Sequence, residues 1–192
     1  MYSLLPEEKK ILIINNGAYS FRAVEICEYY GMPFINLEFP IDERPSLELI
    51  EQVLKENNDI ALVYTTHNET GTGILNPVRE IGALVHRYGA VFVVDTTSTY
   101  AMRPIDIKKD NIDFCMASAQ KGLMAMTGVS FVIGNKSIIE RSKDYPKRSY
   151  YCNLYLHYDY FEKHGEMHFT PPVQTVYAMR QAIAEYFAEG EQ

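Results

Sequence analysis

Short apolar runs alternate with amphipathic segments along most of the chain. The runs with the length and continuous apolar character of buried strands are residues 11–15 (ILIIN), 33–39 (PFINLEF), 60–66 (IALVYTT), 90–97 (AVFVVDTT), 114–119 (FCMASA) and 129–135 (VSFVIGN). Helical spacing of apolar residues marks the segments 20–31, 46–57, 78–89, 136–143 and 172–190. Strands that are apolar on both faces and alternate with helices are typical of βαβ units. The pattern therefore predicts an α/β fold with three αβα layers around a mostly parallel sheet.

Residues at the ends of these segments support the predicted boundaries. Ser46 suits the N-cap of one helix, and Pro77 precedes another. Gly31 and Gly89 suit the position just after a helix, where a left-handed backbone is common. The stretch 144–171 is rich in Tyr, His and Pro, and its apolar residues follow neither the spacing of a helix nor that of a strand. We expect it to be irregular and to wrap the surface or meet a partner subunit.

Composition narrows the class of protein without naming a function. The 192 residues are 47% hydrophobic and 22% charged, which fits one globular domain whose core needs neither a disulfide nor a metal. The net charge of −7 leaves no electrostatic basis for nucleic-acid binding. The three cysteines are odd in number and widely spaced, as reduced thiols are. No apolar run is long enough to span a bilayer and the start lacks the core of a signal peptide, so we expect a cytoplasmic protein.

Polar loops follow the predicted strands at one edge of the sheet. In parallel α/β sheets, ligands bind beyond the carboxyl ends of the strands. The loops with this position are NNGAYS (15–20), THNETGTG (66–73), DTTST (95–99) and SAQKG (118–122). We therefore expect the chemistry of the protein to lie in them.

Two of these loops hold an acid and an amine at the ends of candidate neighbouring strands. Taken singly, Asp95 is a turn or N-cap aspartate, and Lys121 is a surface lysine that extends past the sheet edge. Taken together, they suit pyridoxal phosphate, because an amine bonds to its aldehyde and a carboxylate keeps its pyridine nitrogen protonated. Spacing alone leaves both interpretations open.

Other polar residues in the loops also have two interpretations. His67 is most simply a hydrogen-bonded loop histidine. Thr70 and Thr72 in ETGTG are turn residues whose hydroxyls also suit contact with a cofactor oxygen. Tyr19 is either an aromatic residue that packs on the core or a platform that stacks on a ring.

Metal and nucleotide motifs are weak in this sequence. The run HGEMH places His164, Glu166 and His168 on one face if it is extended, but it is short and has no fourth ligand nearby. We predict no metal site. The ETGTG loop lacks P-loop spacing and no GxGxxG follows a strand, so nucleotide sites of those two kinds are not expected.

Longer segments, read in order, resemble those of one enzyme family. The segments NGAYSFR, HNETGTGILNPVREIG, VVDTTSTYAMRPIDI, IDFCMASAQKGLMAMTGVSFVI and HFTPPVQTVYAMRQAI are similar to successive parts of class V aminotransferases of the fold type I pyridoxal phosphate family. Within it, the similarity is greatest to the 2-aminoethylphosphonate:pyruvate subgroup. The order and approximate spacing agree over nearly the whole chain.

The resemblance assigns roles to individual residues. It implies that Lys121 bonds covalently to pyridoxal phosphate and that Asp95 pairs with the pyridinium nitrogen. It implies that Thr70 lies near the phenolic oxygen of the cofactor and that Tyr19 lies against its ring. Two further cofactor contacts follow by resemblance. Gln120 takes a polar position before the lysine, and Thr170 reaches the phosphate in a neighbouring subunit, which implies a homodimer.

The departures from the family pattern keep the substrate open. The subgroup implies transfer of the amino group of 2-aminoethylphosphonate to pyruvate, giving phosphonoacetaldehyde and alanine. Gln120 replaces the asparagine usual in that subgroup, as in alanine–glyoxylate relatives, so an alanine– or serine–glyoxylate aminotransferase is the alternative. Thr97 stands where a methionine is common and makes the pocket wall more polar.

The resemblance also sets the expected domain organisation. The turn that binds the cofactor phosphate and the arginine that binds the substrate carboxylate have no counterpart here. We expect residues 1–192 to be one partial large domain, with a core at 10–143 and a closing helix at 172–190, that lacks the N-terminal segment and the C-terminal small domain. A catalytically incompetent fragment is therefore a further alternative.

Overall fold

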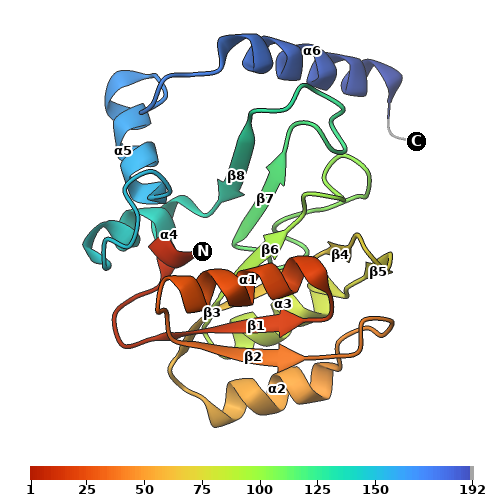
Figure 1. The fold of residues 1–192 in the computed structure, drawn as a ribbon, viewed down its shortest axis with the longest axis vertical. Coiled ribbons are helices and arrows are strands. Elements are labelled where there is room, and N and C mark those ends of the chain that lie inside the picture. The colour runs from red at the N-terminus through yellow and green to blue at the C-terminus, as the bar shows by residue number, and fades with distance from the viewer. Residues whose placement is uncertain (191–192) are drawn as a thin grey trace.

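A six-stranded sheet forms the centre of the molecule (Figure 1). The computed structural model describes residues 1–190. The strand order is β2-β1-β3-β6-β7-β8, with bounds β1 Lys10–Asn15, β2 Phe34–Glu38, β3 Ile60–Thr66, β6 Val91–Asp95, β7 Phe114–Ser118 and β8 Ser130–Gly134. Every pairing is parallel except β7 with β8. The predicted α/β fold with a mostly parallel sheet is confirmed.

Helices cover both faces of the sheet. On one face, α1 (Ala18–Tyr29) packs Ala23 and Val24 against Leu62, Tyr64 and Val93 of the strands. On the other face, α2 (Leu47–Glu56) and α3 (Val78–Arg87) pack around the remaining strand side chains, among them Leu12, Ile14, Val63, Phe92 and Val94. Strand residues alternate between the two clusters because successive side chains of a strand point to opposite faces.

The predicted helix ends are confirmed where capping residues define them. The Ser46 hydroxyl accepts a hydrogen bond from the Leu49 backbone N–H at 3.3 Å. Gly31 and Gly89 have φ values of +59° and +73°, a backbone conformation that strongly favours glycine. These residues end α1 and α3 and turn the chain back into the sheet.

Two parts of the structure differ from the sequence-based expectation. Residues Asn68–Glu69 (β4) and Ile74–Leu75 (β5) form a small antiparallel hairpin in the loop after β3. The prediction of an irregular stretch over 144–171 is wrong at Leu154–His164, which form the helix α5. Asn153 caps α5 by accepting from the Leu156 N–H at 3.1 Å, and Gly165 ends it at a φ of +69°. Capping residues at both ends thus stabilise a helix that the Tyr- and His-rich composition did not predict.

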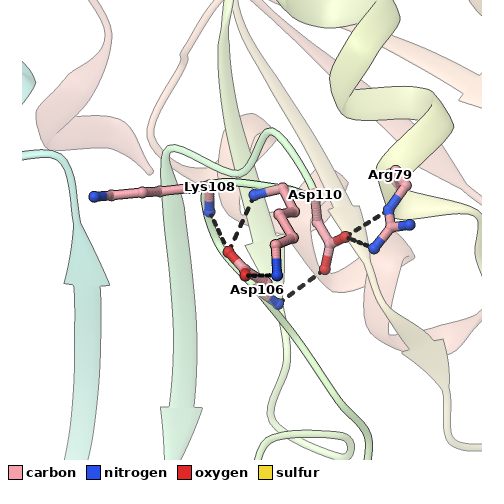
Figure 2. Close-up of polar contacts among 5 residues, drawn as sticks. Arg79, Asp106, Lys108 and Asp110 are labelled. Atoms are coloured by element: carbon pink, nitrogen blue, oxygen red, sulfur yellow. Dashed lines mark hydrogen bonds and ion pairs between the residues drawn. The ribbon is translucent and has the colours of Figure 1, made fainter.

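A loop without a helix, residues 96–113, connects β6 to β7, and polar contacts fix the turn in its second half (Figure 2). Arg79 of α3 donates from Nε to Asp110 Oδ1 at 2.7 Å and forms an ion pair with the same carboxylate. The other oxygen of Asp110 accepts from the Asp106 N–H at 3.0 Å. Asp106 in turn accepts from the backbone N–H groups of Lys108 and Lys109. The pairing offsets the cost of burying Asp110, and it anchors this turn on α3.

The C-terminal elements contact the sheet sparsely. Short 3₁₀ turns lie at Tyr2–Leu4, near the N-terminus, and at Ser142–Asp144, directly after α4 (Lys136–Arg141). From there α5 leads to α6 (Val173–Glu189), which runs along one side of the molecule (Figure 1). Thr175 is the one buried residue of α6. The helix predicted for 172–190 therefore forms, but most of its apolar side chains are exposed. None of the helices described is both long and apolar enough to cross a membrane.

Candidate active site

The polar loops singled out by the sequence meet at one edge of the sheet. The parallel strands β1, β3, β6 and β7 end there at Asn15, Thr66, Asp95 and Ser118. The N-terminus of α1 lies at the same edge because α1 begins shortly after β1 ends. The carboxyl edge of the sheet therefore brings the loops 15–20, 66–73, 95–99 and 118–122 together.

Asp95 lies at this edge on the face of the sheet that α1 covers. It pairs in register with Thr66 of β3 and Met116 of β7. Its Oδ1 accepts from the Thr97 backbone N–H at 2.8 Å, and its Oδ2 accepts from the Tyr64 hydroxyl at 3.4 Å. No ion pair within residues 1–190 involves this half-buried carboxylate. Asp95 is thus held by neutral donors and keeps its capacity to bind a cation.

A buried acid that the sequence reasoning missed fixes the start of α1. Glu69 is fully buried and accepts hydrogen bonds from the backbone N–H groups of Tyr19 at 3.2 Å and Ser20 at 2.7 Å. The Thr66 hydroxyl donates to the same carboxylate at 3.1 Å. A Cβ at Gly17 would lie 2.6 Å from Glu69 Oε2, so only glycine leaves room for this contact. Glu69 therefore ties the ETGTG loop to the helix that carries Tyr19.

A second buried network joins the loop after β1 to the loop after β5. The side-chain amides of Asn16 and Asn76 donate to each other at 2.8 and 3.0 Å. Asn76 also donates to the Thr66 carbonyl at 3.0 Å. Both asparagines are buried, and their pairing spans 60 residues of sequence. The sequence analysis named neither asparagine, because a single sequence gives no sign that positions 16 and 76 are partners.

His67 has a structural role in the same region. Its ring Nδ1 lies 2.9 Å from the Thr99 hydroxyl, and its backbone N–H donates to the Asp95 carbonyl. Burial lowers the pKa of His67. This agrees with the interpretation of a hydrogen-bonded loop histidine.

Lys121 lies in an exposed loop directly beyond β7. Backbone hydrogen bonds from Met124 to the Lys121 carbonyl at 2.8 Å and from Ala125 to the Ala119 carbonyl at 3.0 Å shape this loop. The side chain of Lys121 makes no ion pair among the residues described, 1–190. Gln120 beside it is exposed as well. Lys121 thus lies at the carboxyl edge of the sheet, and its role stays a prediction.

The remaining predicted cofactor contacts divide into two groups. Tyr19 and Thr70 lie at the carboxyl edge, at the start of α1 and in the β4–β5 hairpin, and both are exposed. Thr170 is exposed in the segment between α5 and α6. Thr175, one turn into α6, donates to the Thr127 carbonyl at 3.3 Å and links this segment to the chain beyond Lys121. The structure groups five of the six predicted residues at one edge and places Thr170 outside that group; the roles of all six stay predictions.

The residues present suit pyridoxal phosphate in their chemistry. Asp95 is a half-buried acid without a cationic partner, and Lys121 is an amine without an acidic partner in the part of the chain described. Ser118 Oγ, at the same edge, is buried and has no hydrogen-bond partner within residues 1–190. A ligand with a ring cation, a carbonyl carbon and acceptor oxygens would satisfy all three groups.

The His-rich segment does not form a metal site. Within residues 1–190, no group of three or more His, Cys, Asp or Glu side chains is arranged to hold an ion. His164 and His168 instead pack against the Tyr160 ring, with centroid distances of 4.3 and 4.5 Å. Glu166 accepts a hydrogen bond from the hydroxyl of the same tyrosine. This run therefore contributes to an aromatic cluster.

Comparison with known proteins defines the class. Residues 1–191 match the family Aminotransferase class-V, and the chain belongs to this family. Enzymes of the family use pyridoxal phosphate. The solved structure of an alanine–glyoxylate aminotransferase from Nostoc sp. superposes with a TM-score of 0.86 at 26% identity, covering 98% of this chain and 50% of that one. A pyridoxamine-pyruvate aminotransferase from Mesorhizobium loti superposes with a TM-score of 0.88 at 23% identity, covering 98% and 48%, which supports the fold alone.

Sequence relatives point to one subgroup of that class. The chain is 36% identical to a 2-aminoethylphosphonate–pyruvate transaminase of Lysinibacillus sphaericus, covering 96% of this chain and 50% of the relative. It is 38% identical to another from Phocaeicola vulgatus, covering 98% and 52%. A bifunctional phosphonoacetaldehyde hydrolase/aminoethylphosphonate transaminase of Clostridioides difficile is 36% identical, with 98% and 30% covered. The chain thus spans about half or less of the length of these relatives.

Proposed function

We propose that the protein transfers the amino group of 2-aminoethylphosphonate to pyruvate, with pyridoxal phosphate as cofactor, giving phosphonoacetaldehyde and alanine. The observation that carries the proposal is the placement of Asp95 and Lys121. Asp95 ends β6 and Lys121 follows the neighbouring strand β7 at the same sheet edge, and neither has a partner of opposite charge in the chain described. The transaminases that are 36–38% identical favour this donor and acceptor.

Each of these two residues has a defined task in the proposal. When bound, pyridoxal phosphate supplies an aldehyde that bonds to amines and a ring that takes up electrons. Lys121 would hold the cofactor through its Nζ and, as a free amine, would take a proton from the substrate carbon as a general base. Asp95 would accept a hydrogen bond from the protonated ring nitrogen, and its negative charge would keep that proton bound.

The other predicted residues position the cofactor. Tyr19 at the start of α1 would lie against one face of the ring, and Thr70 and Gln120 would contact its polar substituents. Thr170 reaches the phosphate group in a second subunit, so the proposal includes a homodimer. Glu69 supports this arrangement from below, since its hydrogen bonds to the Tyr19 and Ser20 N–H groups fix the backbone that carries the tyrosine.

The experiment adds pyridoxal phosphate to the protein that carries these 192 residues and records the visible spectrum. We expect an absorption band of lysine-bound cofactor that Lys121→Ala abolishes and that the surface control Lys55→Ala retains. Borohydride reduction followed by peptide mass spectrometry should place the cofactor on Lys121. An unchanged band in Lys121→Ala, or a label on another lysine, would refute the assignment.

A second candidate is an aminotransferase of the alanine–glyoxylate type. Gln120 favours it, and so does the similarity to the Nostoc structure. 2-Aminoethylphosphonate separates the candidates, because it is a donor only in the first. Alanine is the product of the first reaction and the donor of the second, so it should bleach the lysine-bound band in both. Bleaching by 2-aminoethylphosphonate supports the first proposal, and bleaching by alanine alone supports the second. If neither donor bleaches a band that Lys121→Ala abolishes, the chain binds the cofactor without catalysing transfer.

A further inference from the structure

Tyr64 is a polar residue in the apolar centre of β3. Its side chain is only 6% exposed and packs in the core cluster beneath α1 with Leu62 and Val93. A phenylalanine would supply the same ring, so the hydroxyl is the feature that needs an explanation. The one hydrogen bond that this hydroxyl makes among the described residues goes to Asp95 Oδ2, at 3.4 Å.

Burial, together with nearby negative charges, keeps the Tyr64 hydroxyl protonated. Burial raises the pKa of Tyr64 well above its ordinary value, and the negative charges of Asp95 on β6 and Glu69 on β4 add to the effect. Arg22 on α1 opposes it more weakly. The phenol therefore acts as a donor at every pH at which the protein is expected to work, and Asp95 acts as the acceptor.

Two donors from different elements then hold the two oxygens of one carboxylate. The Thr97 N–H binds Oδ1 at 2.8 Å from the turn after β6, and the Tyr64 hydroxyl approaches Oδ2 from β3. A carboxylate with a donor on each oxygen cannot rotate freely about its χ2 bond. Each oxygen keeps a second lone pair for a further donor. The arrangement fixes the plane of the carboxylate and still leaves it able to bind a cation.

We propose that Tyr64 is a positioning residue that holds the Asp95 carboxylate in the orientation that binds the ring nitrogen of the cofactor. The binding of the cofactor ring nitrogen by Asp95 rests on the proposed function, whereas the energetic coupling between Tyr64 and Asp95 does not. Asp95 pairs in register with Thr66, and Tyr64 lies two residues before Thr66 on β3, farther from the carboxyl edge. Tyr64 therefore acts on the cofactor only through Asp95. Nothing in the family resemblance assigned a role to this position.

The first arm of the test uses the cofactor-free protein. A double-mutant cycle of Tyr64→Phe and Asp95→Ala is measured by urea unfolding. We expect Tyr64→Phe to lower the midpoint in the parent protein and to have at most a third of that effect in the Asp95→Ala background. Tyr100→Phe is the matched control, because the described residues give its hydroxyl no hydrogen bond. Equal effects of Tyr64→Phe in both backgrounds would overturn the proposal.

The second arm measures binding of pyridoxal phosphate. We expect Tyr64→Phe to raise the Kd about 2- to 10-fold, the range that the loss of one ordinary hydrogen bond supports. In the Asp95→Ala background the same change should leave the weaker Kd unaltered. A simple packing defect would weaken binding in both backgrounds and would overturn the positioning role. If the parent protein binds no cofactor while the unfolding cycle shows coupling, the proposed function fails and the contact stands.

Discussion

Two regions meet at the carboxyl edge of the sheet, and they are built differently. Around Asp95, buried side chains make a dense set of hydrogen bonds that involves Glu69, Asn16 and Asn76. Around Lys121, a short exposed loop is held by a few backbone hydrogen bonds, and its polar side chains point to solvent. The acid is thus preorganised by the chain itself, whereas the amine is free to move.

This difference has a chemical reason. A group that only stabilises charge works best when it does not reorganise during the reaction, so rigid support suits Asp95. A lysine that bonds to a carbonyl, leaves it and then carries a proton must change position between steps. The proposed function therefore predicts that the network under Asp95 is essential for stability and that the Lys121 loop tolerates change at its surface.

The largest effect should come from removing the acid under α1. Glu69→Ala deprives two backbone N–H groups and the Thr66 hydroxyl of their acceptor in a fully buried site. Each unpaired buried donor costs about 1–3 kcal/mol, so for three donors we expect a loss of about 3–9 kcal/mol in the free energy of unfolding. Urea denaturation measures it, and Glu28→Ala on the exposed side of α1 is the control. A loss equal to that of the control would show that the hydrogen bonds of Glu69 do not stabilise this region.

A smaller loss is expected from breaking the amide pair. Asn76→Ala removes two hydrogen bonds of Asn16 and one of the Thr66 carbonyl, in a site without exposed surface. We expect about 2–4 kcal/mol lower stability by the same measurement, against no change for Asn58→Ala, which is exposed. Asn16→Ala combined with Asn76→Ala should cost less than the sum of the two single changes. Additive losses would show that the two amides do not act as a pair.

The Lys121 loop has one rigid point, and the third prediction tests it. A Cβ at Gly122 would overlap the Tyr100 carbonyl oxygen, so Gly122→Ala must displace the loop or the turn after β6. We expect about 1–3 kcal/mol lower stability and a several-fold weaker Kd for pyridoxal phosphate, because the neighbouring lysine moves with the backbone. Gly71→Ala is the matched control, since its Cβ would meet open space. If both changes leave binding and stability intact, the Lys121 loop is mobile throughout, and it differs even more from the rigid region around Asp95.

The sequence predicted the strands and loops that form this edge, but not the buried hydrogen bonds that hold the loops in place. Apolar runs located the strands because both faces of the sheet are covered, and Asp95 and Lys121 were found because polar residues follow such strands. The partners of Glu69 and Asn76 lie 49 and 60 residues away, so only the folded chain reveals them. The helix α5 was missed because tyrosine and histidine give no clear period. The exposure of α6 and of the Lys121 loop depends on neighbours in space, which local patterns do not report.

The smallest predicted effect concerns the one histidine inside the rigid region. Burial lowers the pKa of His67 in the folded protein from the ordinary value of 6.5, so below that pH the unfolded chain binds a proton that the folded one resists. The stability that the neutral ring contributes is present above pH 6.5 and is lost as the pH falls through the lower, folded pKa. The difference in unfolding free energy between the parent and His67→Gln should therefore shrink on acidification. Urea titrations at a series of pH values measure this difference, with His164→Gln, an exposed position, as control. A difference that stays constant with pH would mean that His67 gains its proton without loss of the Thr99 contact, and the network around Asp95 would then be less rigid than its hydrogen bonds indicate.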